Sequence, residues 1–327
     1  MTEFKNETFT YDHSNTSKVL FWFFLSLETL LICVGNTVIC WLLCFRKKLR
    51  TKQNMFVLSL SVSDLFVGIS VPPCEYCAFK VAYPNSCAYI CGSVISFNIL
   101  ASAVNLTLIA TDRYFSIVMP FAYEKRVTWK RAITIIIFAW LLALFLTLIP
   151  FIWMFDGKML TAQKIRTNII FSITVFSCII LNGWLIGSMY YRIVKIVQWQ
   201  LQKRINNKRR NTAGIKVCIM VAISYFICWI PTAVIEVLYQ YIVYIPLEVS
   251  SIAYFLLLLN PCLDPLMYGY YRKDFRKEIC RLFGCKKSNN HSKSQTSHSY
   301  FHLSIQKSLP APSFKKCFKE EYKEIIR

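Results

Sequence analysis

Two oppositely charged side chains stand next to each other at the end of a long apolar stretch. Asp112 and Arg113, followed by Tyr114, close a run that extends from Ala88 to Leu108. Ionisable groups close to hydrocarbon are costly and usually functional. The pair can be a solvated helix end with an incidental contact between neighbours. Alternatively, it is a switch in which Asp112 restrains Arg113 until a partner at the inner side of a membrane needs the guanidinium.

Two further carboxylates lie inside apolar stretches, where an unpaired charge is costly or takes up a proton. One helix offers a polar stripe at i, i+4 and i+7 that could face them, namely Asn98, Ser102 and Asn105. Carboxylate, hydroxyl and amide oxygens suit a hard cation such as Na⁺. The alternative is a hydrated structural network. The predicted sodium ligands are Asp64, Ser102 and Asp264, and the wider polar network adds Asn36, Asn98 and Asn260.

The composition indicates which elements position these groups. The chain has 327 residues, 55% hydrophobic and 17% charged, which is too apolar for one soluble domain of this length. Seven apolar segments are long enough to cross about 30 Å of hydrocarbon as helices, and no strand-like alternation is present. The predicted fold class is an all-α membrane protein, a seven-transmembrane helix bundle with a short amphipathic interfacial helix after span seven. The predicted spans are residues 19–45, 54–79, 88–118, 131–152, 168–197, 213–240 and 248–270.

The net charge of +21 could by itself indicate nucleic-acid binding. Its distribution argues against that, because Lys and Arg cluster in the loops after spans one, three, five and seven. The positive-inside rule then predicts a multi-pass plasma-membrane protein with an extracellular amino terminus and a cytoplasmic tail. We expect an extracellular segment at residues 1–18, the bundle with its interfacial helix at residues 19–285, and a disordered tail at residues 286–327. No cleavable signal peptide is expected, so the first span serves as its own anchor.

Several positions could carry modifications. The sequons at Asn6 and Asn15 precede the first span and are predicted glycosylation sites. Cys280 and Cys285 follow the seventh span, in the region where S-palmitoylation occurs. Residues 272–283 place apolar side chains on one face of a helix and Arg and Lys on the other, which predicts a helix in the membrane interface.

Short motifs occur along the spans in a fixed order. They are Gly35-Asn36, Leu60-Ser61-Val62-Ser63-Asp64-Leu65, Asp112-Arg113-Tyr114, Trp140, Tyr190-Tyr191-Arg192-Ile193, Cys228-Trp229-Ile230-Pro231, Asn260-Pro261, Asp264-Pro265-Leu266-Met267-Tyr268 and Phe275. Each is weak alone. Together, over about residues 20–283, they resemble a rhodopsin-like (class A) G-protein-coupled receptor.

The resemblance implies a receptor that binds an extracellular ligand in the outer half of the bundle and activates a heterotrimeric G protein through its inner face. Trp229 stands ahead of a helix-kinking proline, which would turn a small outer displacement into a larger inner swing. Arrestin, receptor kinases and membrane lipids are further expected partners, and Na⁺ is an allosteric ion rather than a cofactor. The residues expected to switch or to contact the G protein are Asp112, Arg113, Tyr114, Phe121, Tyr190, Trp229, Pro231, Asp264, Pro265 and Tyr268.

The outer half of the bundle is expected to hold the ligand cavity. Amine receptors of this family carry an aspartate on span three that pairs with the ligand, whereas the matching residue here, five turns before Arg113, is Ile95. A conventional biogenic amine is therefore not expected. Two glutamates favour a cationic or donor-rich ligand, such as a peptide, a nucleoside or an unusual amine, unless they are rim charges that reach water. The expected pocket residues are Glu75, Ile95, Ser96, Trp229, Glu236 and Tyr254.

The chain departs from the family pattern in its cysteines and in span five. The second outer loop, residues 151–167, contains no Cys, so Cys87 or Cys91 pairs with Cys74 or Cys77 or stays free. Asn182 stands where span five usually carries a proline. These features are similar to the melanocortin, lipid, cannabinoid and adenosine receptor group, whereas others resemble amine and trace-amine receptors.

The restraint on Arg113 also differs from the family. Many relatives hold this arginine with an acid from span six, near the position of Asn211. Without that acid, Arg113 is expected to be restrained mainly by Asp112. This predicts elevated signalling in the absence of ligand.

Other classes of protein fit less well. A transporter or channel would often show internal symmetry, and none is found. An opsin needs a lysine in span seven, which Ser251–Tyr270 lacks. The sequence contains no motif for a catalytic nucleophile or a metal site, so an enzyme is not expected. A decoy receptor that binds without signalling stays open as an alternative.

Overall fold

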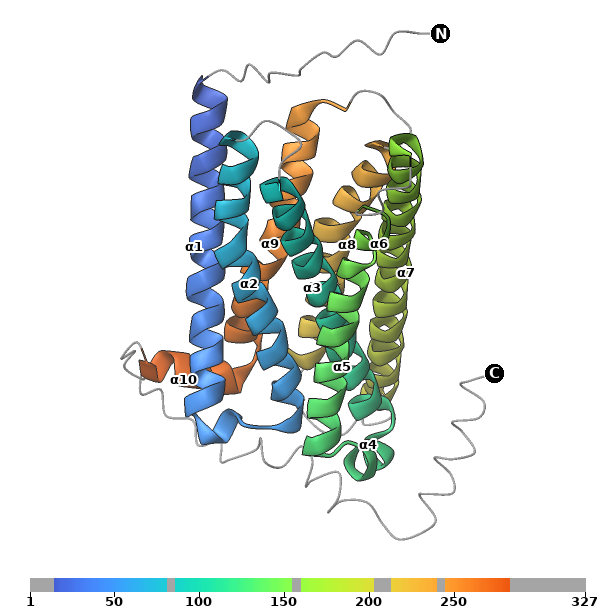
Figure 1. The fold of residues 1–327 in the computed structure, drawn as a ribbon. Coiled ribbons are helices and arrows are strands. Elements are labelled where there is room, and N and C mark those ends of the chain that lie inside the picture. Colours follow the sequence, from blue (N-terminus) through green and yellow to red (C-terminus); the bar gives the residue numbers. More distant parts are fainter. Residues whose placement is uncertain (1–14, 81–85, 155–159, 203–212, 240–244, 283–327) are drawn as a thin grey trace. The chain divides into compact units, whose positions relative to one another are not determined.

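Seven long helices form a bundle within the residues that the computed structural model describes (Figure 1), which are 15–80, 86–154, 160–202, 213–239 and 245–282. All of them belong to one compact unit, Met1–Phe283. Each long helix overlaps one predicted span, and α7 extends furthest beyond its span, from residue 161 instead of 168 and to residue 202 instead of 197, so the seven-helix fold is confirmed. The helices are α1 (Asn15–Phe45), α2 (Lys52–Lys80), α3 (Ser86–Val118), α5 (Trp129–Leu148), α7 (Thr161–Gln202), α8 (Ala213–Tyr239) and α9 (Leu247–Tyr271).

The outward faces of these helices are compatible with hydrocarbon. Six of the helices are long and apolar enough to cross a membrane, and α8 contributes a shorter apolar stretch at Ile219–Ile235. Large apolar side chains are exposed around the bundle, for example Phe138 and Phe145 on α5 and Trp184 on α7. Lipid tails solvate such side chains well, and each helix satisfies its own backbone polar groups.

Glycines allow helices of the bundle to approach closely, as two examples show. A Cβ atom at Gly35 of α1 would lie 2.9 Å from Cγ of Pro265 in α9. One at Gly183 of α7 would lie 2.7 Å from Cε1 of Tyr225 in α8. Small residues at helix interfaces permit this packing in membranes, so a larger residue at either position would require the neighbouring side chain or its helix to shift.

Prolines interrupt three helices. Pro231 lies inside α8, and α9 contains Pro265 as well as Pro261. A proline within a helix removes one backbone hydrogen bond and favours a bend. A further pair, Pro72-Pro73, lies inside α2 near its carboxyl end and was not anticipated as a helix distortion.

Four short helices complete the described residues: η1 (Lys47–Leu49), α4 (Pro120–Arg126), α6 (Phe151–Met154) and α10 (Lys273–Leu282). The predicted interfacial helix corresponds to α10. Its Phe275 is fully buried and lies 6.0 Å, between ring centroids, from Tyr268. Glu278, also buried, lies 3.6 Å from Nε of Arg46 beyond α1. These two contacts dock α10 against α9 and α1.

Candidate functional site

Asp64 of α2 and Asp264 of α9 form a buried acid pair inside the bundle. Their exposed fractions are 0% and 1%, and their carboxyl groups interact with each other. No donor from the described residues reaches any oxygen of either group. Two such carboxyls repel each other unless a proton or a cation lies between them.

Neighbouring helices bring further unsatisfied polar atoms to this level of the bundle. Asn36 of α1 donates to the carbonyl oxygen of Pro261 at 3.0 Å, and its own side-chain oxygen has no partner in the described part of the chain. The Ser102 hydroxyl and the Asn260 amide nitrogen also lack partners among the described residues. Buried polar atoms are normally satisfied. The carboxylate and hydroxyl oxygens fit a hard cation such as Na⁺.

The predicted polar stripe of α3 divides between different partners. Asn98 donates to Ser70 of α2 at 2.6 Å, and Asn105 accepts from Ser59 of α2 at 2.7 Å. Of the three stripe residues, only Ser102 keeps an unsatisfied oxygen. Asn98 therefore ties α2 to α3, and its amide nitrogen is not available to the acid pair.

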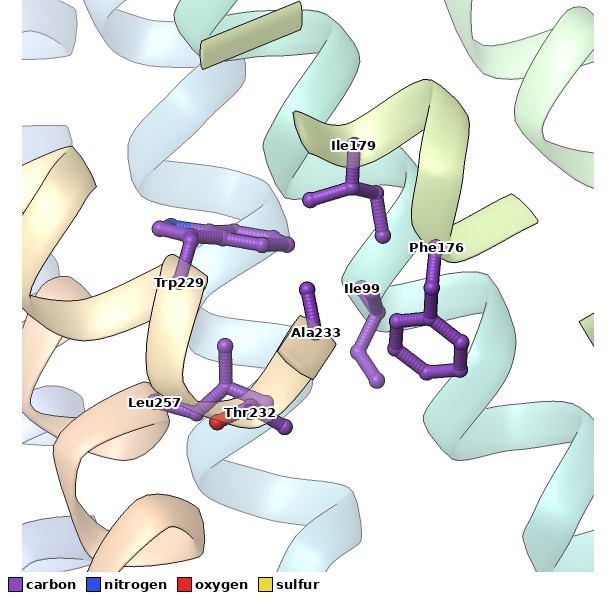
Figure 2. A pocket seen from close by; sticks show the side chains of 7 residues that line it. All are labelled: Ile99, Phe176, Ile179, Trp229, Thr232, Ala233 and Leu257. Carbon is purple, nitrogen blue, oxygen red and sulfur yellow. The ribbon is translucent and has the colours of Figure 1, made fainter. Parts of the chain in front are cut away.

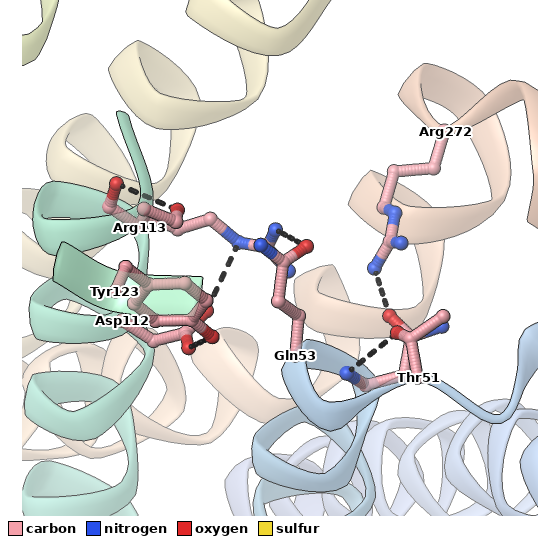
Figure 3. A network of polar contacts seen from close by, with 8 residues as sticks. Thr51, Gln53, Asp112, Arg113, Tyr123 and Arg272 are labelled. Atoms are coloured by element: carbon pink, nitrogen blue, oxygen red, sulfur yellow. Dashed lines mark hydrogen bonds and ion pairs between the residues drawn. The ribbon is translucent and has the colours of Figure 1, made fainter. Parts of the chain in front are cut away.

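We call the end of the bundle where α1 begins the outer end, and the end beside α10 the inner end. At the inner end, Arg113 takes part in the polar network of Figure 3. Its guanidinium donates to Oε1 of Gln53 at 2.9 Å, whereas its Nε lies 4.0 Å from Asp112. Asp112 instead accepts a 2.5 Å hydrogen bond from the hydroxyl of Tyr123 in α4. Gln53 is thus the closer partner, which corrects the expectation that Asp112 is the main restraint.

Three successive residues at the start of α2 each contact a different element. Lys52 donates to the carbonyl oxygen of Val127 after α4 at 2.9 Å. Gln53 meets Arg113 of α3, and Asn54 accepts from Arg272 at 2.8 Å (Figure 3). We call Lys52, Gln53 and Asn54 the inner clamp. It links α2 to α3, to the α4 region and to the end of α9.

Two ionisable groups of this network lie outside the membrane-spanning segments. The pKa of Arg272 is lowered to about 10, mainly by burial and secondly by the like charge of Arg113. Burial raises the pKa of the Tyr123 hydroxyl, and its bond to Asp112 raises that pKa further. Arg272 therefore stays cationic and Tyr123 stays protonated at neutral pH.

The predicted inner tyrosines lie in the main apolar core. Tyr190 of α7 and Tyr268 of α9 are both buried, in one cluster with Ile193 and Met267. Phe121 at the start of α4 is 48% exposed. The described inner end is therefore packed around the tyrosines, while Phe121 is accessible for contact with a partner.

Trp229 lies beside two adjoining cavities on the outer side. It is stacked on Tyr225, one turn earlier in α8, with ring centroids 5.5 Å apart and an angle of 9°. The smaller cavity, about 180 Å³, is shown in Figure 2 and is lined by Ile99, Phe176, Ile179, Trp229, Thr232, Ala233 and Leu257. The larger, about 400 Å³, is lined by Val67, Val71, Ile95, Asn98, Ile99, Ser102, Trp229, Tyr254, Leu257, Leu258 and Pro261.

The expected pocket residues are only partly brought together. Ile95 and Tyr254 line the larger cavity, and the Tyr254 hydroxyl donates to Glu75 of α2 at 2.7 Å. Ser96 is exposed and is not among the lining residues, which corrects its assignment to the pocket. Glu236 lies within α8, but its side chain is outside the described part of the chain.

The cysteine alternatives are narrowed by a disulfide between Cys77 of α2 and Cys87 of α3. Cys74 and Cys91 are free.

In span five, Asn182 accepts from Thr107 of α3 at 2.7 Å. The residue at the usual proline position therefore bonds α7 to α3.

The predicted modification sites and Asn211 lie at or beyond the edges of the described residues. Asn6, Asn211 and Cys285 lie outside the described residues. Asn15 is the first residue of α1, and its side chain is not described. Cys280 lies on α10 and is partly exposed.

The sequence reasoning missed several residues of these sites. Gln53, Tyr123 and Tyr225 are unremarkable polar or aromatic residues, and only the packing brings them to Arg113, Asp112 and Trp229. Glu28 did carry a signal, because it is an acid within the first apolar span. Its Oε2 is buried without a partner among the described residues.

Comparison with known proteins gives one family. Residues 35–268 match the family described as 7 transmembrane receptor (rhodopsin family). The human histamine H2 receptor is 26% identical, over 85% of this chain and 83% of that protein. The D(1C) dopamine receptor of Xenopus laevis is 28% identical, over 88% and 74%. Neuropeptide FF receptor 1 of Rattus norvegicus is 26% identical, over 84% and 72%. The chain therefore belongs to the rhodopsin family of seven-transmembrane receptors and is a G-protein-coupled receptor of the cell surface.

Proposed function

We propose that the ligand occupies the larger cavity and directs a cationic or donor-rich group to Glu75. The supporting observation is the contact between Tyr254, which lines that cavity, and the Glu75 carboxylate at 2.7 Å. An apolar lining with a few polar groups is typical of a small-molecule site. Most of the lining is apolar, so the ligand also needs an apolar body.

The lining argues against the usual way of binding an amine. Ile95 faces the larger cavity and offers no charge to an ammonium group. A peptide end or a nucleoside, with several donors beside an apolar part, matches the combination of Glu75, Tyr254 and Asn98. These groups lie at one cavity or in contact with its lining.

An amine that pairs with Glu75 is the second candidate. The names of two relatives, the histamine H2 and D(1C) dopamine receptors, indicate amine ligands. That of neuropeptide FF receptor 1 indicates a peptide. An ammonium group would replace Tyr254 as the partner of the carboxylate and would also neutralise its charge, which a phenol cannot do.

Trp229 is the proposed link between the ligand and the inner end. It lines both cavities and packs on Tyr225, whose hydroxyl bonds to the carbonyl oxygen of Ile179 in α7 at 3.0 Å. A ligand that displaces the indole would disturb this α7–α8 contact. Pro231, two residues on, makes α8 a helix that can bend there, and the bend would move its inner part.

At the inner end, opening releases Arg113 from Gln53 and rearranges the side chains of Tyr190 and Tyr268. The freed guanidinium and the exposed Phe121 then contact the G protein. The ligand acts by shifting the population between the closed and open arrangements. A receptor that binds ligand without this step is the decoy alternative, and the complete Asp112-Arg113-Tyr114 motif favours signalling.

Na⁺ bound by Asp64, Asp264 and Ser102 would stabilise the closed arrangement. The cation supplies the positive charge that this buried acid pair lacks among the described residues. Asn36 and Asn260 would complete the polar surroundings. A proton shared by the two carboxyls is the competing way to relieve their repulsion.

The outer end is proposed to face the extracellular space. Basic residues cluster in the opposite loops, and the Cys77–Cys87 disulfide lies at the outer end, as expected in an oxidising compartment. Glycans at Asn6 and Asn15 belong to that side. The inner side would carry palmitate on Cys280 and Cys285 and the tail of residues 286–327. It would also contact arrestin, receptor kinases and lipid headgroups.

The test is a signalling screen of peptides, nucleosides, amines and lipids on cells that express the receptor, with G-protein activation as readout. For the active ligand, Glu75→Gln should lower potency at least about tenfold, the equivalent of 1.4 kcal/mol. Ser96→Ala, an exposed position on α3, is the matched control and should have no effect. Full potency in Glu75→Gln would contradict the proposed binding mode.

A further inference from the structure

Four cysteines gather where α2 ends and α3 begins. Cys74 and Cys77 are three residues apart on α2, and Cys87 and Cys91 are four residues apart on α3. Residues at these spacings lie on one face of a helix, one turn apart. Because consecutive spans run in opposite directions, Cys77 and Cys87 form the outer level and Cys74 and Cys91 the level one turn deeper.

The outer level is a disulfide, with 6.7 Å between the Cα atoms of Cys77 and Cys87. The Sγ atom of Cys91 lies within 4.8 Å of both of its sulfur atoms. Cys74 stands one turn deeper than Cys77 on the same face of α2, and its side chain interacts with that of Cys91. Cys74 and Cys91 are thus the facing cysteines of α2 and α3 one turn beneath an existing disulfide.

We propose that Cys74 and Cys91 form a second disulfide between α2 and α3, which goes beyond the proposed function. Each thiol loses its proton, and a bond forms between the two sulfur atoms. The two electrons pass to a protein disulfide of the secretory pathway, which is reduced to a dithiol. The Cys77–Cys87 disulfide takes no part in this step.

The arrangement favours pairing within each level, Cys77 with Cys87 and Cys74 with Cys91, over crossed pairs between the levels. Cys91 could also attack the neighbouring disulfide, because its sulfur is close to both Cys77 and Cys87. Such an exchange would only move the bond and leave two thiols, whereas oxidation of the deeper pair consumes both. Cys74 is only 7% exposed, so the oxidant reaches it before α2 and α3 have packed. The finished bond is then protected from reductants.

A second disulfide would fix the outer turn of α2. Glu75 lies between the two cysteines of that turn and holds Tyr254 of α9 at 2.7 Å. With two covalent links to α3, this turn could neither unwind at Pro72-Pro73 nor slide along α3. The chain would thereby fasten its outer end although its second outer loop, residues 151–167, contains no cysteine.

The experiment is a disulfide map of the full-length receptor from eukaryotic cells. Cells are lysed in N-ethylmaleimide so that free thiols are blocked, and the purified chain is digested without reduction. Cleavage after Glu75 separates Cys74 from Cys77, and cleavage after Tyr89 separates Cys87 from Cys91. Mass spectrometry then identifies each linked pair of peptides. Cys178, an exposed free thiol on α7, reports whether labelling is complete.

We expect a linked Cys74–Cys91 peptide pair, unlabelled by maleimide, together with the Cys77–Cys87 pair. In the double variant Cys77→Ser, Cys87→Ser, the deeper link alone should still join the two helices. Maleimide on both Cys74 and Cys91 of the unmodified chain would overturn the proposal, as would crossed pairs. The map involves no ligand and no G protein, so its result is independent of the signalling experiments.

Discussion

The two ends of this bundle are held together by different kinds of interaction. At the outer end, a disulfide joins α2 to α3, and one carboxylate–phenol hydrogen bond links α2 to α9 beside apolar cavities. At the inner end, the inner clamp of α2 bonds to three other parts of the chain through hydrogen bonds of 2.8–2.9 Å. A covalent link persists during signalling, whereas hydrogen bonds can be exchanged for bonds to a partner. The end that we propose for ligand binding is thus fixed covalently, whereas the end that we propose for G-protein contact is held by bonds that can be released.

The largest expected effect comes from the switch residue itself. Arg113→Ala should reduce ligand-stimulated nucleotide exchange at least about 100-fold, since loss of the charged contacts proposed between Arg113 and the G protein would amount to about 2.7 kcal/mol. Exchange is measured on membranes of transfected cells. Ligand binding should persist, because Arg113 lies far along α3 from Ile95. Normal exchange in this variant would remove Arg113 from the mechanism.

The acid pair between the two ends should show a smaller effect. If Na⁺ binds there, added NaCl will lower agonist affinity about five- to tenfold relative to N-methylglucamine chloride, within the usual range of coupling between sites. Asp64→Asn should abolish this difference. Asn105→Ala, which removes a polar group bonded to Ser59 instead, serves as control. A sodium effect that survives in Asp64→Asn would place the cation elsewhere.

Changes at Gln53 test whether the inner clamp restrains signalling. Gln53→Ala removes a 2.9 Å hydrogen bond to Arg113. Basal nucleotide exchange should therefore rise about threefold, in line with the loss of a partly exposed hydrogen bond to a charged group.

Gln53→Glu supplies the acid that the family usually takes from span six and should lower basal exchange below that of the unmodified receptor. Gln163→Ala, an exposed glutamine at the opposite end, should change nothing. Equal basal activity in both Gln53 variants would show that this contact does not hold the closed state.

The smallest expected effect is that of pH on two groups of the inner network. The lowered pKa of Arg272, about 10, is still well above neutral, and the pKa of Tyr123 is raised. Between pH 6 and 8 neither group changes charge. Basal exchange in the Tyr123→Phe variant should therefore differ from the unmodified receptor by a constant factor across that range. A factor that varies with pH would show that the Tyr123–Asp112 bond titrates.

The sequence predicted the architecture well because the signals for it are local. Each span is a continuous apolar stretch. In hydrocarbon its backbone polar groups must bond to each other, and a helix achieves this within a single segment. Once the bounds of the spans are known, the sequence also gives the position of each motif residue on its span, as for Asp64, Asp264, Trp229 and Pro231. The pairing of Asp64 with Asp264 was also expected, since both are intramembrane acids that need partners.

Contacts between elements could not be read in this way. Asn98, Ser102 and Asn105 share one helical stripe, yet only the packing of α2 directs the first to Ser70 and the last to Ser59. Ser96 and Ile95 are adjacent in sequence, but the tilt and rotation of α3 place only Ile95 at the cavity. Rotations of this kind depend on the shapes of the facing side chains.

What the sequence by itself determined is the number of helices, the residues that each contributes, and the family motifs that they carry. Hydrophobicity and local spacing suffice for these. The tertiary structure alone decided which groups meet: Gln53 with Arg113, Glu75 with Tyr254, and Cys77 with Cys87. Each of these pairs joins different helices. No local pattern encodes such contacts, because they depend on how the helices pack, and helix packing is a property of the whole bundle.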